Sequence, residues 1–313
     1  MKTFSCLLLL LILFSGCNPR AYDIDACVTF EPPEAYIQSL PSSFEPLTPA
    51  ELETDWGREL HIANQFGPDL DLYRAITGYK RALILIPKSQ EERKNQIEYH
   101  ILYSYFLAGK YQEVVDHFEK SQLAQVPQDF PAYRDMLVII YFSYDKTGHP
   151  YRRDAILRFI HEYDQQLAED LEMSLHISNG DLCAVMNQEH RFAQGYQDHF
   201  CHYQQNRLSV RKAQIFNAIL PGAGYLYTGQ RRTAITAFLL NAAFITATYE
   251  LFHNGYPAAG VIVGSLEFGW YFGGINGAGL SAKYYNDQAY NCYAKEAMLD
   301  QRLFPILMLQ RAF

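Results

Sequence analysis

The stretch Asn217–Ala282, NAILPGAGYLYTGQRRTAITAFLLNAAFITATYELFHNGYPAAGVIVGSLEFGWYFGGINGAGLSA, decides the fold of this chain. It contains two apolar runs, Thr233–Phe252 and Ala258–Gly279, and each is about as long as the roughly 20 residues that a helix needs to cross a bilayer. The residues between the runs suit a tight turn, because Gly255 tolerates a positive φ and Pro257 can open a helix without losing a needed donor. The stretch therefore predicts a helical hairpin that crosses a membrane or lies in its interface.

Glycines recur every few residues along the second apolar run, at Gly260, Gly264, Gly269, Gly273 and Gly277. This spacing puts a smooth ridge on one helix face, and small residues let helix backbones approach closely in lipid. We expect the ridge to pack against the first run of the same chain; association between copies, giving a homo-oligomer, is the alternative. Glu267 lies in the middle of the run, and we expect its carboxyl group to pair with Asn241 or with a threonine of the first run.

A proline and three glycines precede the first run, within a motif formed by Pro221, Gly222, Gly224, Tyr227 and Gly229. These residues break the helix expected over Ala213–Leu220 and let the chain re-enter at the membrane interface, with tyrosines at the level of the lipid headgroups. An ordinary glycine-rich turn is the alternative. The spacing is similar to the P-G-x-G-x-x-Y-x-G motif of a group of small bacterial two-span membrane domains, and the Ser281–Asn286 segment also resembles that group.

Residues 1–16 have the layout of a secretory signal, with one lysine, an apolar run and small residues before Cys17. The small residues resemble the lipobox of bacterial lipoproteins, which implies that Cys17 is the lipidated first residue of the mature chain. Phe14 stands where that family prefers leucine, and an ordinary signal or an uncleaved anchor is the alternative. In an oxidising compartment the remaining cysteines can pair, and Cys183 with Cys201 is the first pair to test.

The segment 17–55 is rich in proline, serine and acidic residues, which predicts an extended and partly disordered tether. Near its end, Thr48-Pro-Ala-Glu51 has the pattern of a capping box, so a helix is expected to begin there.

Residues 56–203 repeat with a period of about 39 residues, which is the mark of a solenoid of helix pairs. Ile62, Ile101 and Ile140 share this period, and so do Gly109 and Gly148. Within the units, the small, large, small and proline pattern of the second helix resembles the tetratricopeptide repeat, at Ala75, Tyr79, Ala82 and Pro87. The fold class we predict is all-α.

A solenoid of helix pairs has a concave face that suits a protein or an extended peptide. The candidate residues for this partner-binding face are Tyr99, His100, Tyr103 and Tyr133. The resemblance therefore implies a binding role for the repeats.

The chain carries a formal charge of −8, which argues against non-specific nucleic-acid binding. Its two dense basic clusters, Arg207/Arg211/Lys212 and Arg231/Arg232, lie just before the first apolar run of the predicted membrane segment 204–286, where lipid headgroups are the simpler partner. The positive-inside rule would place these flanks in the cytoplasm, whereas an export signal places the repeats outside it. We favour export, and therefore a bacterial cell envelope location with the repeats facing the periplasm. The last segment, 287–313, is expected to be an amphipathic helix to about Leu303, broken by Pro305.

No P-loop, nucleophile elbow or dinucleotide fingerprint occurs in the chain. One cluster holds metal-ligand residue types, at Glu189, His190, His199, Cys201 and His202, but it lacks a metal-binding motif. We therefore expect no cofactor, no metal and no enzymatic activity. The favoured function is a membrane-anchored envelope scaffold that binds a protein or peptide; the alternative is a membrane factor that assists lipid handling or membrane-protein insertion and assembly through the hairpin.

Overall fold

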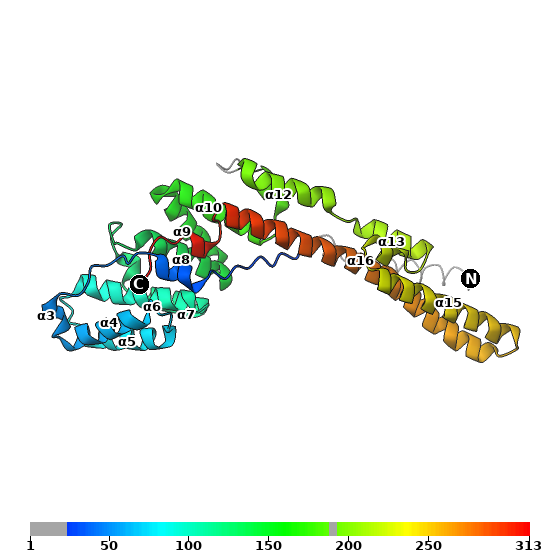
Figure 1. Ribbon diagram of the computed structural model, residues 1–313, viewed down its shortest axis with the longest axis horizontal. Helices are drawn as coiled ribbons and strands as arrows, with labels where there is room; N and C mark the ends of the chain where they lie inside the picture. The colour runs from blue at the N-terminus through cyan, green and yellow to red at the C-terminus, as the bar shows by residue number, and fades with distance from the viewer. Residues whose placement is uncertain (1–23, 188–192) are drawn as a thin grey trace. The chain divides into compact units, whose positions relative to one another are not determined.

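A computed structural model describes residues 24–187 and 193–313 (Figure 1). The predicted signal peptide, Cys17, Glu189 and His190 lie outside these residues. The described residues are mostly helical and form no β-strand longer than an isolated bridge, which confirms the all-α prediction. They divide into two units: the repeat unit holds Thr29–Leu175 and Met298–Phe313, and the membrane unit holds residues 24–28 and His176–Ala297.

The repeat unit is built from consecutive helix pairs that contact one another, α4 with α5, α6 with α7, and α8 with α9 (Figure 1). Gly109 and Gly148 occupy equivalent turns of the second and third pairs, and their φ angles of 68° and 71° explain why both turns use glycine. The helices of this unit are α2 (Glu34–Ser39), α3 (Pro49–Leu52), α4 (Asp55–Phe66), α5 (Leu72–Leu85), α6 (Glu91–Leu107), α7 (Tyr111–Lys120), α8 (Tyr133–Lys146), α9 (Pro150–Tyr163), most of α10 (Gln165–Ser178) and α17 (Pro305–Met308), with a short 3₁₀ turn, η2, at Leu123–Gln125.

Small residues bring the first helix pair together. Gly78 approaches Ala63 so closely that a Cβ at Gly78 would lie 2.9 Å from the Ala63 Cβ. Ala75, Tyr79 and Ala82, which carry the small, large, small pattern, are fully buried. Ile101 and Ile140 are also buried, but Ile62 is 48% exposed, so the expected isoleucine repeat does not extend to the first unit.

The segment expected to be a loose tether is packed against the repeat unit. The Phe30 ring lies 5.1 Å from the Phe304 ring, and the Tyr36 hydroxyl donates to the Leu307 carbonyl at 3.5 Å. Its aromatic side chains explain this, because their burial stabilises an ordered path that a purely polar tether would lack. The capping box is confirmed: the Thr48 hydroxyl accepts from the Glu51 N–H, and the Glu51 carboxylate accepts from the Thr48 N–H at 2.7 Å.

The membrane unit contains two helices that are long and apolar enough to cross a membrane, α15 (Arg231–His253) and α16 (Pro257–Asp300). They form a hairpin in Figure 1, whose turn uses Gly255 at a φ of 79° and Pro257 as the first residue of α16, as expected. The most apolar windows of the two helices are only 6% and 11% buried, so most of their apolar surface is exposed within the described part of the chain. The unit also contains α11 (Leu182–Asn187), α12 (Ala193–Asn206), α13 (Val210–Ile219) and α14 (Ala223–Tyr227).

The second apolar helix is longer than expected. We predicted that the membrane hairpin would end at residue 286 and that a separate amphipathic helix would begin at residue 287, but α16 runs unbroken for 44 residues to Asp300. No glycine or proline lies between Leu280 and Asp300, so nothing interrupts the helix. The chain after Pro305 is a short helix followed by an extended tail.

Each of the four cysteines in the described part of the chain is a free thiol, at Cys27, Cys183, Cys201 and Cys292. The pairing of Cys183 with Cys201 is therefore not formed in the structure.

Candidate functional site

The predicted partner-binding residues are buried. Tyr99, His100 and Tyr103 of α6 are each no more than 1% exposed, and Tyr133 at the start of α8 is 7% exposed. Tyr133 belongs to a separate cluster, where its ring packs against Tyr163 at 5.3 Å. A partner can therefore reach the α6 side chains only where the chain's own covering segments are displaced.

Two aromatic rings from distant parts of the chain cover the α6 side chains. The Phe44 ring lies 5.8 Å from the Tyr99 ring and 5.2 Å from the His100 ring. The ring of Phe313, the last residue, lies 4.9 Å from the Tyr103 ring and 5.8 Å from the His100 ring. The segments before α3 and after α17 thus occupy the surface that we expected to be open.

Several polar atoms of the covered surface have no hydrogen-bond partner among the described residues. Among the described residues, no partner is present for the Tyr99 hydroxyl, the Tyr103 hydroxyl or either ring nitrogen of His100. Burial lowers the pKa of His100 to about 3 and raises the pKa values of Tyr99 and Tyr103, so all three side chains are neutral at pH 7. Buried polar groups are normally bonded, so this cluster calls for an explanation other than packing.

The extended tail is held through its backbone. The carboxylate of Asp135, on α8, accepts from the N–H groups of Gln310 and Arg311 at 2.9 and 2.8 Å. The Ala312 N–H donates to the Pro41 carbonyl at 3.0 Å, within a parallel bridge between the tail and the segment that carries Phe44. Burial raises the pKa of Asp135, and the two N–H donors act in the opposite direction.

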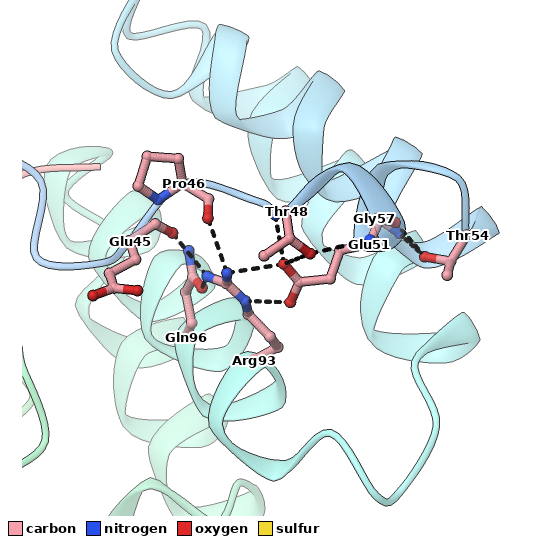
Figure 2. Close-up of polar contacts among 8 residues, drawn as sticks. All are labelled: Glu45, Pro46, Thr48, Glu51, Thr54, Gly57, Arg93 and Gln96. Carbon is pink, nitrogen blue, oxygen red and sulfur yellow. Dashed lines mark hydrogen bonds and ion pairs between the residues drawn. The ribbon is translucent and has the colours of Figure 1, made fainter.

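Arg93 fixes the segment that carries Phe44 (Figure 2). Its guanidinium donates to the Glu51 carboxylate at 2.8 and 3.1 Å, and to the backbone carbonyls of Glu45 and Pro46 at 2.8 and 3.1 Å. The bidentate pair with Arg93 is the largest cause that lowers the pKa of Glu51 to about 2. Because Glu51 also closes the capping box of α3, a single ion pair links α3 to α6.

Sequence reasoning did not find Asp135, Arg93 or Phe313. Their partners lie far away along the chain, so local periodicity carries no trace of the contacts. A buried position for Asp135 was nevertheless readable, since it sits beside apolar residues in the YRDMLVIIYF run of α8.

In the membrane unit, the predicted turn motif forms a tight re-entrant turn between α13 and α15. Gly222 has a φ of 95°, and its N–H donates to the Asn217 Oδ1 at 2.9 Å. A Cβ at Gly222 would overlap the Ala234 carbonyl oxygen, and one at Gly224 would overlap that of Ala213. Both glycines are therefore required by close approach of the backbone, and α13 ends just before Pro221.

The rest of the motif bonds to the segment before α13 and to α16, where the Thr228 and Ser281 hydroxyls lie 2.9 Å apart. The Tyr227 hydroxyl accepts from the Ser209 N–H at 3.1 Å, while Gly229 closes the turn with a φ of 80°. Asn286 bonds both the N–H and the carbonyl of Leu208 at 2.8 Å, as a side chain that mimics a strand partner. The Pro221–Gly229 motif and the Ser281–Asn286 segment therefore belong to one packed structure.

The glycines of the ridge have different surroundings in the structure. Gly260 contacts Phe252 of α15 and Gly264 contacts Thr248, as expected for packing within the hairpin, while Gly277 contacts Tyr225. Gly269 and Gly273 differ, because a Cβ at either would have no described atom within 4 Å apart from its chain neighbours and the nearby backbone of α16. These two glycines instead line a cavity of about 650 Å³.

The expected pairing of Glu267 is not found. The amide nitrogen of Asn241 donates to the Ala237 carbonyl at 2.6 Å, on its own helix. Within the described part of the chain, neither carboxyl oxygen of Glu267 has a hydrogen-bond partner, and neither does the nearby Thr248 hydroxyl. The residue borders a second cavity, of about 440 Å³, that is lined by α15 and α16.

Across residues 24–187 and 193–313, no group of three or more His, Cys, Asp or Glu side chains is placed to hold a metal ion. His199 lies 3.7 Å from the Glu296 carboxylate. No family model matches this chain, and neither a curated protein nor a solved structure matches it.

Proposed function

We propose that this protein is a non-enzymatic, membrane-anchored scaffold of the bacterial cell envelope, whose repeat unit binds an extended peptide segment of another protein. The observation that carries the proposal is the binding of residues 310–313 by Asp135 and the α6 aromatic cluster. The chain's own tail acts as a ligand in cis at this surface.

The geometry suits recognition of extended peptides in general. Asp135 bonds backbone N–H groups, which any peptide presents at positions other than proline. The rings of His100 and Tyr103, which contact Phe313, favour an aromatic side chain at that position. The unpartnered Tyr99, His100 and Tyr103 supply donors and acceptors that a ligand with polar side chains would satisfy. A partner that presents an aromatic residue together with polar groups would therefore compete with the tail.

The remaining parts of the chain provide the anchorage. The helix pairs and their positive-φ glycines support the resemblance to tetratricopeptide repeats, and the α15–α16 hairpin supports association with a membrane. Together with lipidation at Cys17, which the lipobox resemblance implies, the hairpin would hold the repeats at the periplasmic side of a membrane.

A binding experiment with the full-length chain in detergent tests the proposal. The probe is a fluorescent peptide that copies residues 304–313. The Phe313→Ala variant has a weakened tail, so it should bind the probe more tightly than the wild type does. Adding Asp135→Ala should weaken this binding about 30-fold, the loss expected for about 2 kcal/mol, whereas adding Asp145→Asn should leave it unchanged, because Asp145 pairs with Arg153 at 2.9 Å.

Failure of the probe to bind the Phe313→Ala variant would show that the tail is only a structural cap, and the proposal would fall. If the probe binds, photo-crosslinking in cells from a probe residue placed at Phe313 identifies the natural partner, which the probe peptide should displace.

A further inference from the structure

The cavity of about 650 Å³ lies wholly within the membrane unit, between the re-entrant turn, α15 and α16. Arg232 and Asn241 of α15 line it, and so do Gly269, Trp270 and Gly273 of α16. Because Gly269 and Gly273 meet no described atom, the middle of the glycine ridge is left open by the fold. A groove of this size between two lipid-facing helices can hold part of an acyl chain.

Asn241, which lines the cavity, has an unsatisfied hydrogen-bond acceptor. Its side chain is 4% exposed, and its Nδ2 donates to the Ala237 carbonyl at 2.6 Å. Only the nitrogen of an amide can donate to a carbonyl, so this bond fixes which atom is Oδ1. That oxygen has no hydrogen-bond partner within the described residues, so the cavity presents a buried acceptor that needs an O–H or N–H donor.

Arg232 places a positive charge at the cavity. It is the second residue of α15, at the end of the helix that follows the re-entrant turn, and none of the residues that line the cavity is acidic. A cation at the end of a membrane helix attracts anionic lipid headgroups. The Cα atoms of Arg232 and Asn241 are separated by about 13 Å along the helix axis, given the rise of 1.5 Å per residue. One ligand therefore reaches both residues only if the long, flexible Arg232 side chain folds toward Asn241, with the anion nearer the surface and the donor deeper.

We propose that this cavity binds a lipid that carries a phosphate and, below the phosphate, a hydrogen-bond donor such as the N–H of an amide-linked acyl chain or the O–H of a hydroxylated one. The phosphate pairs with Arg232, the donor bonds the Asn241 Oδ1, and a chain lies over Gly269 and Gly273. Ordinary diacylglycerol phospholipids have only ester acceptors at that depth and leave Asn241 unsatisfied. This role goes beyond the scaffold function and does not depend on the repeat unit.

Lipid binding to the full-length chain in detergent tests the proposal, with native mass spectrometry to measure occupancy. Four probes separate the contribution of the phosphate from that of the hydrogen-bond donor. They are ceramide 1-phosphate, phosphatidic acid of matched chain length, ceramide without phosphate, and inorganic phosphate. The wild type should bind ceramide 1-phosphate about tenfold more tightly than phosphatidic acid, the difference that one hydrogen bond to a buried acceptor makes. Inorganic phosphate alone should bind too weakly to detect.

Three variants assign the contacts. Asn241→Leu should bring ceramide 1-phosphate and phosphatidic acid to equal affinity, and Arg232→Gln should remove the preference for ceramide 1-phosphate over ceramide. Arg231→Gln is the matched control, because Arg231 is exposed and does not line the cavity. Gly269→Leu should weaken the binding of every lipid probe. Protease resistance of the hairpin shows whether each variant is folded.

Other outcomes would overturn the proposal. Equal affinity of the wild type for the two phosphate lipids would remove the role of Asn241. Equal losses in the Arg231→Gln and Arg232→Gln variants would show general attraction of anions to the surface. Tight binding of inorganic phosphate would assign the site to a free anion. Absence of lipid together with a change from oligomer to monomer in Gly269→Leu would show that a second copy of the chain covers the ridge.

Discussion

Replacement of Asp135 by alanine should release the C-terminal tail while leaving the repeat unit folded. The carboxylate accepts two backbone N–H groups, from Gln310 and Arg311, at 2.9 and 2.8 Å. Charge-assisted bonds of this kind contribute about 1.5–3 kcal/mol each. Asp135 is 2% exposed, so desolvation of its charge offsets part of this gain. We therefore expect a net loss of about 2 kcal/mol for the docked tail, which corresponds to roughly a 30-fold rise in the open population.

Hydrogen exchange on the full-length chain in detergent measures this change directly. The amides of Gln310 and Arg311 should exchange about 30-fold faster in Asp135→Ala, because local opening governs their exchange. Amides in α4 and α5 should keep their wild-type rates. Asp145→Asn is the control on the same helix, and it should leave tail exchange unchanged. Unchanged exchange at the tail in Asp135→Ala, or faster exchange throughout the repeat unit, would refute the reasoning.

Two further variants test other parts of the structure. The pKa of Glu51 falls from 4.5 to about 2 in the folded chain, so the Arg93 ion pair contributes stability that is present above pH 4.5 and lost as the pH falls toward 2. The melting temperature should accordingly drop less between pH 7 and pH 3 in Glu51→Gln than in the wild type; an equal drop would contradict this role. Gly222→Ala should make the hairpin protease-sensitive in detergent, because its Cβ would overlap the Ala234 carbonyl. Gly229→Ala, with a positive φ but open space, should cost only about 1 kcal/mol and keep the hairpin resistant; equal sensitivity of the two variants would rule out the close approach.

Local signals predicted much of this fold. The capping box, the two apolar helices and the turn at Gly255 follow from chemistry within a few residues, and the structure has all of them. The equivalent turns at Gly109 and Gly148 follow from the repeat, since a positive φ at the same place in each unit requires the same residue. The end of α16 was not predicted correctly. The apolar pattern ends at Gly279, but no helix-breaking residue lies between Leu280 and Asp300, so the helix continues to Asp300.

Long-range contacts could not be predicted from the sequence. The tail reaches Asp135 across more than half of the chain, and Phe44 meets Phe130 from a segment whose composition indicated a loose tether. Tyr99, His100 and Tyr103 were predicted to lie on an open concave face of the repeats. Their burial depends on covering segments that no periodicity identifies. In the membrane unit, the motif located the turn between α13 and α15. The sequence did not show that the middle of the glycine ridge is left open, because this depends on how the helices pack.

Alkaline carbonate extraction of cell membranes tests the central claim most directly, namely that a helical-repeat unit is held at a membrane by the α15–α16 hairpin. The full-length chain, expressed with its leader intact, and its Cys17→Ser variant should both remain in the membrane pellet and be released only by detergent, because the exposed apolar faces of α15 and α16 need lipid. Recovery of either protein as a soluble monomer without detergent would contradict the account.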